Sequence, residues 1–206
     1  MGGWVNPPLA QRDARRPRVR RGALRIYAGL LCAFAVCIAG ATQAANPPSD
    51  LERAVKAAYL YKFLNYVEWP SSAFADDSAP FVIGVYGADD VAAQLTQLAA
   101  EHDVAGRRVE VRRLKRNEPL AGVHVLFVGA QEAAHLPALV RAARQRALLL
   151  VSEEKDGLDA GSAINLVVDD DRVRFDIAPE NAERMGVHLS SRLLAVARTV
   201  RDRGAD

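Results

Sequence analysis

Three short runs of almost wholly apolar residues constrain the fold of this chain most. They span residues 81–86, 123–128 and 147–151, and each has the length of a strand rather than that of a buried helix. Such runs fit strands that are covered on both faces of a parallel sheet. Helical patterns over residues 89–101 and 132–146 follow the first and second runs. This order predicts β-α-β units and a sheet between two layers of helices.

Further elements are expected at both ends of this region. Ser49 and Glu52 form a capping box that opens a helix, which we expect to continue as far as Pro70. Residues 107–114 alternate between apolar and charged side chains and predict a half-exposed strand.

The last third of the chain has a different pattern. Residues 163–168 and 172–177 flank three aspartates and predict a β-hairpin. Ser190 or Ser191 can cap a last helix, whose inner face would carry Leu193, Leu194, Ala197 and Val200. The predicted fold class is therefore α/β: a single three-layer domain with a mainly parallel sheet flanked by helices, and with a C-terminal β-hairpin and helix.

The first 44 residues are typical of a secretory signal peptide. An arginine-rich stretch precedes the uncharged apolar residues 26–40, and the small residues at 41–45 suit a signal peptidase. A membrane anchor is the alternative, but an apolar run of about 15 residues is shorter than the roughly 20 that span a bilayer. We expect residues 1–44 to be removed by cleavage near Ala44, leaving residues 45–206 as one domain in the periplasm.

The uneven placement of charge decides which partners are plausible. The whole chain has 27 basic and 25 acidic residues, but seven arginines and one aspartate fall within residues 1–44. Residues 45–206 therefore carry 20 basic and 24 acidic residues, a net charge of −4, which argues against nucleic acid as a partner. Both cysteines, Cys32 and Cys37, lie in the leader, so the exported chain can form no disulfide.

Motifs for catalysis or metal binding are weak. Ser152 and Lys155 match S-x-x-K, but the partner motifs of penicillin-recognising enzymes are absent, and a polar loop is the preferred interpretation. The aspartates at 169–171 lack the spacing of an EF-hand, and the four histidines share no ligand spacing. We therefore predict no catalytic residue, no metal and no cofactor.

Two surface features could contact a partner. Six bases within ten residues could meet anionic headgroups or an acidic protein, although charges that keep an edge strand from aggregating are the favoured explanation. They are Arg107, Arg108, Arg112, Arg113, Lys115 and Arg116. The first helix is rich in aromatic residues. Tyr59, Phe63 and Tyr66 share its inner face, whereas Tyr61 lies off that face and Trp69 lies at the helix end.

Four segments in a fixed order carry a resemblance to a known family. They are residues 56–63 continuing to 67–70; residues 81–87; residues 149–152 with Gly161 and Ile164; and residues 174–177 with Ala182 and 189–194. Over about residues 50 to 200 the chain resembles the YfiR family of periplasmic proteins. This resemblance implies a regulator that is not an enzyme. Characterised members repress an inner-membrane diguanylate cyclase by binding its periplasmic region, which lowers cyclic di-GMP and biofilm formation.

The resemblance also implies further partners and shows two differences. An outer-membrane lipoprotein can sequester such a repressor and release the cyclase, and related domains occur fused to sensor kinases. Some members respond to redox state through disulfides. Once the leader with Cys32 and Cys37 is removed, this chain has no cysteine and cannot respond in that way. Ala178 stands where the family often has asparagine, so the role of that asparagine is absent here.

Our leading hypothesis is a periplasmic repressor that acts by stoichiometric binding, as a monomer or as a symmetric homodimer. Its expected contact surface is the hairpin, with the aromatic residues of the first helix as the second choice. The partner-binding candidates are Asp170, Asp171, Arg172, Arg174 and Ile177, followed by Tyr61 and Trp69.

Two other classes of function remain as alternatives. A small-molecule-binding input module for a membrane sensor would use the carboxyl ends of the strands, at Gly87, Gly129 and Ser152. A serine hydrolase or penicillin-binding enzyme would depend on Ser152.

Overall fold

The computed structural model describes residues 1–3 and 49–201, and the folded domain lies in the second of these ranges. The chain divides into two units, Met1–Asn46 and Pro47–Asp206. The expected signal peptide and both cysteines lie outside the described residues. Within the described residues, no helix combines the length and the apolar character needed to cross a bilayer.

Strands form one large sheet and one small one. The seven-stranded sheet has the order β3-β2-β4-β5-β6-β7-β9, and β1 pairs with β8 separately. The strands are β1 (Val67–Glu68), β2 (Phe81–Tyr86), β3 (Val109–Leu114), β4 (Val125–Val128), β5 (Leu149–Ser152), β6 (Ile164–Asp169), β7 (Arg172–Ile177), β8 (His188–Leu189) and β9 (Thr199–Val200).

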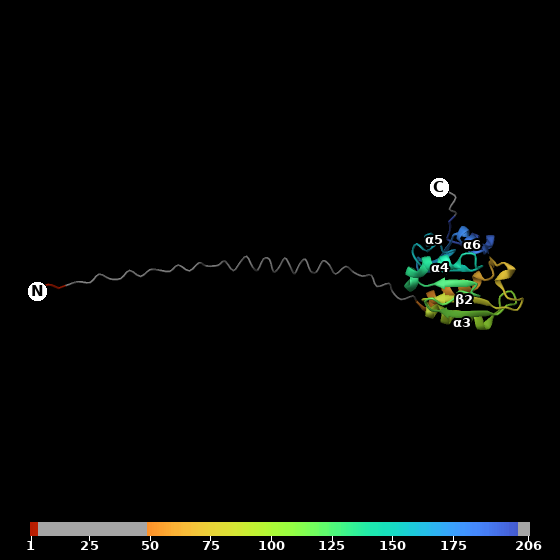
Figure 1. Cartoon of the computed structure of the whole chain (residues 1–206), viewed down its shortest axis with the longest axis horizontal. Helices are drawn as coiled ribbons and strands as arrows, with labels where there is room; N and C mark the ends of the chain where they lie inside the picture. Colours follow the sequence, from red (N-terminus) through yellow and green to blue (C-terminus); the bar gives the residue numbers. More distant parts are fainter. Residues whose placement is uncertain (4–48, 202–206) are drawn as a thin grey trace. The chain divides into compact units, whose positions relative to one another are not determined.

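Helices cover both faces of the large sheet. Figure 1 shows α3 and α4 on opposite sides of β2. The element α2 packs against α3, whereas α4 packs against α5, so each face has its own layer. The helices are α2 (Asp50–Phe63), α3 (Asp89–Glu101), α4 (Leu136–Ala143), α5 (Gly157–Ala160), α6 (Pro179–Met185) and α7 (Ser191–Val196), with 3₁₀ turns η1 (Ser71–Ala73) and η2 (Ala130–His135).

The predicted fold class is confirmed. Strands β3, β2, β4, β5 and β6 are parallel, whereas β6 and β7 form the antiparallel hairpin. The three apolar runs are central strands, and all four residues of β4 and of β5 are buried. Strand β3 lies at the edge of the sheet and pairs only with β2 among the described strands, which is the position that the favoured explanation of the basic cluster requires.

The prediction for the end of the first helix was wrong. Helix α2 ends at Phe63, seven residues before Pro70, because Val67 and Glu68 leave the helix to pair with β8. Tyr66 is therefore exposed rather than part of a helical core face. A proline disfavours helix only at the residue before it, so Pro70 could not reveal this earlier end.

The expected inner face of the last helix needs a similar correction. Ser190 caps α7 through the N–H of Leu193, as predicted, and Leu193 is buried. Val200, however, lies beyond the helix in β9 and is 39% exposed. Arg198 donates its backbone N–H to Phe175, and this pairing draws the chain out of the helix and onto the sheet edge.

A buried histidine joins the amino ends of two strands. His124 lies directly before β4 and is 4% exposed. Its Nδ1 accepts the N–H of Val82 at 3.1 Å, so the neutral ring carries its proton on Nε2, which lies 3.1 Å from the carbonyl of Ala73. Phe74 stacks on the ring with centroids 4.6 Å apart.

We expect the stability of the domain to fall as the pH drops below about 6.5, the ordinary pKa of an unfolded histidine. Burial lowers the pKa of His124 in the folded state, and protonation removes the acceptor for Val82. The loss begins near the unfolded pKa and grows until the pH reaches the folded pKa. Thermal unfolding between about pH 8 and pH 5 should show a smaller pH dependence for His124→Phe than for the wild type. The exposed control His188→Gln should keep the full dependence, and parallel curves for all three proteins would refute the assignment.

Candidate partner-binding surface

The β6–β7 hairpin extends beyond the strand beside it. Only the first two residues of β6 pair with β5, where Ile164 lies opposite Val151 and Asn165 opposite Ser152. All six residues of β6 nevertheless pair with β7, from Ile164 to Asp169. Among the described residues, no strand pairs with the outer half of the hairpin on the β5 side, and the residues of its turn are exposed.

The tip is a tight two-residue turn. Asp169 and Arg172 form the last pair of the ladder, and Asp170 and Asp171 connect them with φ angles of 47° and 58°. Both angles lie in the left-handed region, as a type I′ turn requires, and aspartate tolerates that region better than most residues. The turn residues therefore suit the geometry as well as carrying charge.

The structure brings four of the predicted contact residues together on this hairpin. Asp170, Asp171, Arg172 and Arg174 are all exposed, so the tip presents acidic and basic groups side by side. Val168, which the sequence analysis missed, adds an apolar side chain that is 54% exposed. The sequence could have indicated this exposure, because an apolar residue next to the turn of a predicted hairpin lies too far from the core to be buried in it.

An arginine holds the base of the hairpin. Arg198 donates two hydrogen bonds to the carboxylate of Asp176, at 2.8 and 2.5 Å, and its Nη1 lies 3.6 Å from Asp169. Hydrogen bonds to Asp176 raise the pKa of Arg198 further above its usual value. Because β9 also pairs in parallel with β7, the C-terminal strand fixes the hairpin from its free side.

Ile177 does not belong to this surface. It is fully buried at the opposite end of β7, where it pairs with Ile164 in the core. Ile177 lies three residues from Arg174, and strand side chains alternate between faces, so the two point to opposite sides. Any contact that the hairpin makes with a partner therefore does not include Ile177.

Tyr61 and Trp69, the second-choice residues, lie on other elements. The hydroxyl of Tyr61 donates to the carbonyl of His102 at 2.8 Å, at the end of α3. Trp69 follows β1 and packs edge-on against Phe81, the first residue of β2, with centroids 5.2 Å apart. Both are half-buried, and within residues 49–201 no contact joins either of them to the hairpin tip.

The residues of the small-molecule alternative do not share a pocket. A Cβ atom on Gly129 would lie 2.4 Å from the carbonyl oxygen of Gly87, so these two strand ends pack directly on each other. Ser152 is fully buried within β5 rather than in the predicted polar loop. Its hydroxyl lies 2.6 Å from Oδ1 of Asn165 and 2.8 Å from that of Ser162. This network holds Ser152 away from solvent.

A buried ion pair ties α2 to the carboxyl ends of the central strands. Lys56 is 6% exposed, and its ammonium lies 2.5 Å from Glu153 and 2.6 Å from Glu52. Glu153 also accepts the N–H of Ala130 after β4. Burial alone lowers the pKa of Lys56, but hydrogen bonds to Glu153 and Glu52 outweigh it and raise the pKa. The sequence analysis gave this lysine no role, because its partner lies 97 residues away.

Comparison with known proteins gives a family match. The sequence profile described as YfiR/HmsC-like matches residues 53–198, which extends from the first turn of α2 to beyond the end of α7. Members of this family are periplasmic regulators in cyclic di-GMP signalling rather than enzymes. No curated protein matches the chain.

Two solved structures are similar in fold. A conserved domain protein from Vibrio cholerae O1 biovar El Tor has a TM-score of 0.50 and 14% identity, covering 72% of this chain and 60% of its own. The ABC domain from Streptococcus pneumonia, solved in complex with L-Trp, has a TM-score of 0.44 and 15% identity, covering 59% of this chain and 55% of its own. This chain therefore matches less than two thirds of either protein, and the first similarity supports the α/β fold alone.

Proposed function

The chain belongs to the YfiR/HmsC-like family, and from this premise we propose that it represses an inner-membrane diguanylate cyclase by binding its periplasmic region. The family match over residues 53–198 is the observation that carries the proposal. Repression would lower cyclic di-GMP and biofilm formation, and the chain itself would catalyse no reaction. We further propose that residues 1–44 direct export and are cleaved near Ala44.

Inhibition by binding requires a difference in affinity for two states of the cyclase. A repressor that binds the inactive state better than the active state by a few kcal/mol shifts most of its target to the inactive state. The hairpin tip supports such a role because it is exposed, held at its base and lined by both signs of charge. Mixed charges of this kind select one partner and orientation more than they add affinity.

Release of the cyclase would need a competitor for the same surface. An outer-membrane lipoprotein that binds the hairpin would remove the repressor from its target. Because the exported chain has no cysteine, its control would not depend on thiol oxidation. A homodimer would present two hairpins related by a two-fold axis, which suits a dimeric target.

Deletion of the gene in the native host should raise cyclic di-GMP several-fold. The expected reason is that the cyclase returns to its active state when its repressor is lost. Cyclic di-GMP is measured in nucleotide extracts from the deletion strain, from that strain carrying the whole gene, and from that strain carrying a copy without residues 1–44. Only the whole gene, whose product carries the expected export signal, should restore the low level of cyclic di-GMP. An unchanged level in the deletion strain would refute repression under those growth conditions.

A small-molecule input module is the second candidate function. One observation favours it: a cavity lies beside the carboxyl ends of β2 and β3, and neither Gly87 nor Gly129 lines it. In a doubly wound sheet, ligands bind at this kind of position.

A further inference from the structure

The connection from β3 to β4 differs from the other parallel connections of the sheet. Helices α3, α4 and α5 lie in the connections from β2 to β3, β4 to β5 and β5 to β6, and α6 and α7 lie between β7 and β9. Residues 115–124, in contrast, cross the sheet as turns without a helix. This connection passes over β2, since β3 and β4 flank that strand on opposite sides. The missing helix leaves part of the sheet beside α4 uncovered by a second layer.

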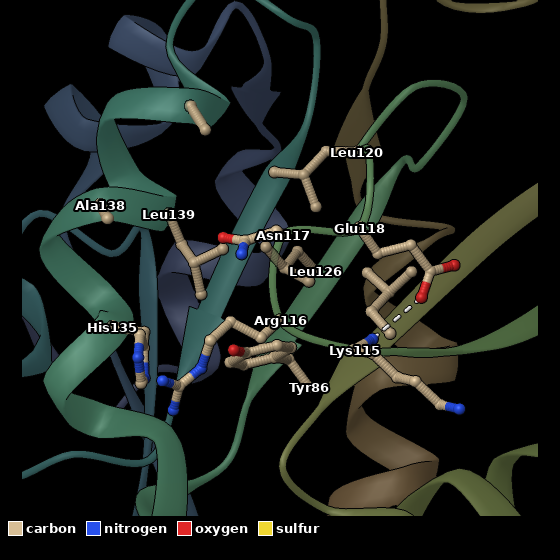
Figure 2. A pocket seen from close by; sticks show the side chains of 12 residues that line it. Tyr86, Lys115, Arg116, Asn117, Glu118, Leu120, Leu126, His135, Ala138 and Leu139 are labelled. Atoms are coloured by element: carbon tan, nitrogen blue, oxygen red, sulfur yellow. Dashed lines mark hydrogen bonds between the residues drawn. The ribbon is translucent and has the colours of Figure 1, made fainter.

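A cavity of about 230 Å³ occupies that place (Figure 2). Its lining is mostly aliphatic, with side chains from β3, β4, the crossing loop and α4. These are Leu114, Leu120, Leu126, Ala138, Leu139 and Ala142. Alanine at two positions of α4 leaves room that larger side chains would fill. The volume is below the 300–1,000 Å³ of sites for drug-sized molecules and suits a small metabolite.

Arg116, Tyr86 and His135 lie together on one side of the cavity. Figure 2 shows the head of Arg116 on the same side as Tyr86 and His135, whose rings lie 6.1 Å apart. Only 5% of Tyr86 is exposed, so its ring is held in place by the surrounding core. In the described part of the chain, no carboxylate pairs with the side chain of Lys115 or Arg116. The cavity therefore offers unpaired positive charge beside a phenol.

Two of the acidic groups nearby, Glu118 and Glu132, have close partners of their own. Glu118 accepts the N–H of Lys115 at 2.9 Å and lies 3.4 Å from Arg112, and these contacts lower its pKa. Glu132 lies 2.8 Å from Nδ1 of His135. The contacts of Glu118 also hold the crossing loop in place, so the wall of the cavity is formed before any ligand enters.

We propose that this cavity binds a small carboxylate with an aliphatic body, the carboxylate meeting Arg116 and the hydroxyl of Tyr86 and the body lying among the leucines and alanines. A guanidinium and a phenol together suit a carboxylate, because a planar fork donates two parallel hydrogen bonds to its oxygens. The aliphatic lining contacts the body of the ligand, with the amide of Asn117 as a polar group within it. The site lies on the face of the sheet that α4 covers, beside Tyr86 and Leu114, the last residues of β2 and β3.

Octanoate is a suitable probe, with 1-octanol and octylamine as matched molecules that differ only in the head group. Titration calorimetry on the purified full-length chain should detect octanoate, and binding of the two controls should be at least tenfold weaker. Arg116→Ala should weaken octanoate about tenfold or more, because a charge-assisted hydrogen bond is lost. Ala142→Leu should weaken it by filling the cavity, whereas Arg141→Ala, a change outside the cavity on the same helix, should not.

The proposal is overturned if octanoate fails to bind at millimolar concentration, if octanol binds as well as octanoate, or if Arg116→Ala and Ala142→Leu both bind like the wild type. Thermal unfolding of each variant shows that the fold is intact. No cyclase is present in this measurement, so its failure leaves repression unaffected. An unchanged cyclic di-GMP level in the gene-deletion strain, which would refute repression, would likewise leave this ligand site standing.

Discussion

Neutralising the hairpin tip is expected to raise cyclic di-GMP several-fold, to the level of the gene-deletion strain. The variant combines Asp170→Asn, Asp171→Asn, Arg172→Gln and Arg174→Gln, which removes the exposed charges and keeps side chains of similar size. Asparagine suits the left-handed positions at 170 and 171, so the turn should survive. Truncating desolvated charged contacts at an interface costs about 2–5 kcal/mol, enough to release most of the target.

The matched control neutralises the same kinds of residue elsewhere on the surface, with Asp77→Asn, Asp156→Asn, Arg141→Gln and Arg146→Gln. It should repress like the wild type, and both variants should melt within a few degrees of it, because exposed charges contribute little to stability. Cyclic di-GMP is measured in the deletion strain carrying each variant, with the amount of exported protein checked. Full repression by the hairpin variant would show that the partner binds another surface, and Tyr61 and Trp69 would be tested next.

Local pattern was sufficient to predict the central sheet. The runs that became β2, β4 and β5 are apolar throughout because both of their faces are covered, and no loop composition imitates that signal. The hairpin could also be predicted, because two segments of alternating apolar and polar residues joined by aspartates form few other structures. Four of its exposed residues could therefore be placed correctly in advance.

The errors arose where distant segments decide the local structure. Helix α2 ends early because Val67 and Glu68 pair with β8, a strand about 120 residues later, and no nearby residue signals that pairing. Ile177 was placed on the surface of the hairpin because its position in the β7 ladder was not considered. Ser152 belongs to a buried strand whose polar partners, Ser162 and Asn165, come from the next connection and from β6.

The largest loss of stability is expected when Lys56 is replaced by methionine. Methionine fills a similar volume, but it leaves the carboxylates of Glu153 and Glu52 close together without their cation. Breaking a buried pair by removing one partner costs about 3–5 kcal/mol, a large part of the roughly 5–15 kcal/mol that stabilises a typical domain. For a domain of this size the melting temperature should fall by roughly 10 °C. Chemical and thermal unfolding of the purified chain measure both quantities.

Two further variants separate the buried pair from an ordinary surface pair. Lys56→Met combined with Glu153→Gln should be more stable than Lys56→Met alone, since glutamine carries no charge and can still accept the N–H of Ala130. Arg201→Met breaks an ion pair with Asp159 in which both side chains are more than half exposed, and it should lower the free energy of unfolding far less than Lys56→Met does. If Lys56→Met lowers the free energy of unfolding no more than Arg201→Met does, the ion pair between Lys56 and Glu153 does not fix α2 on the sheet. Because α2 also packs on Phe175 of β7, a large cost would mean that this ion pair stabilises the helix against which the hairpin packs.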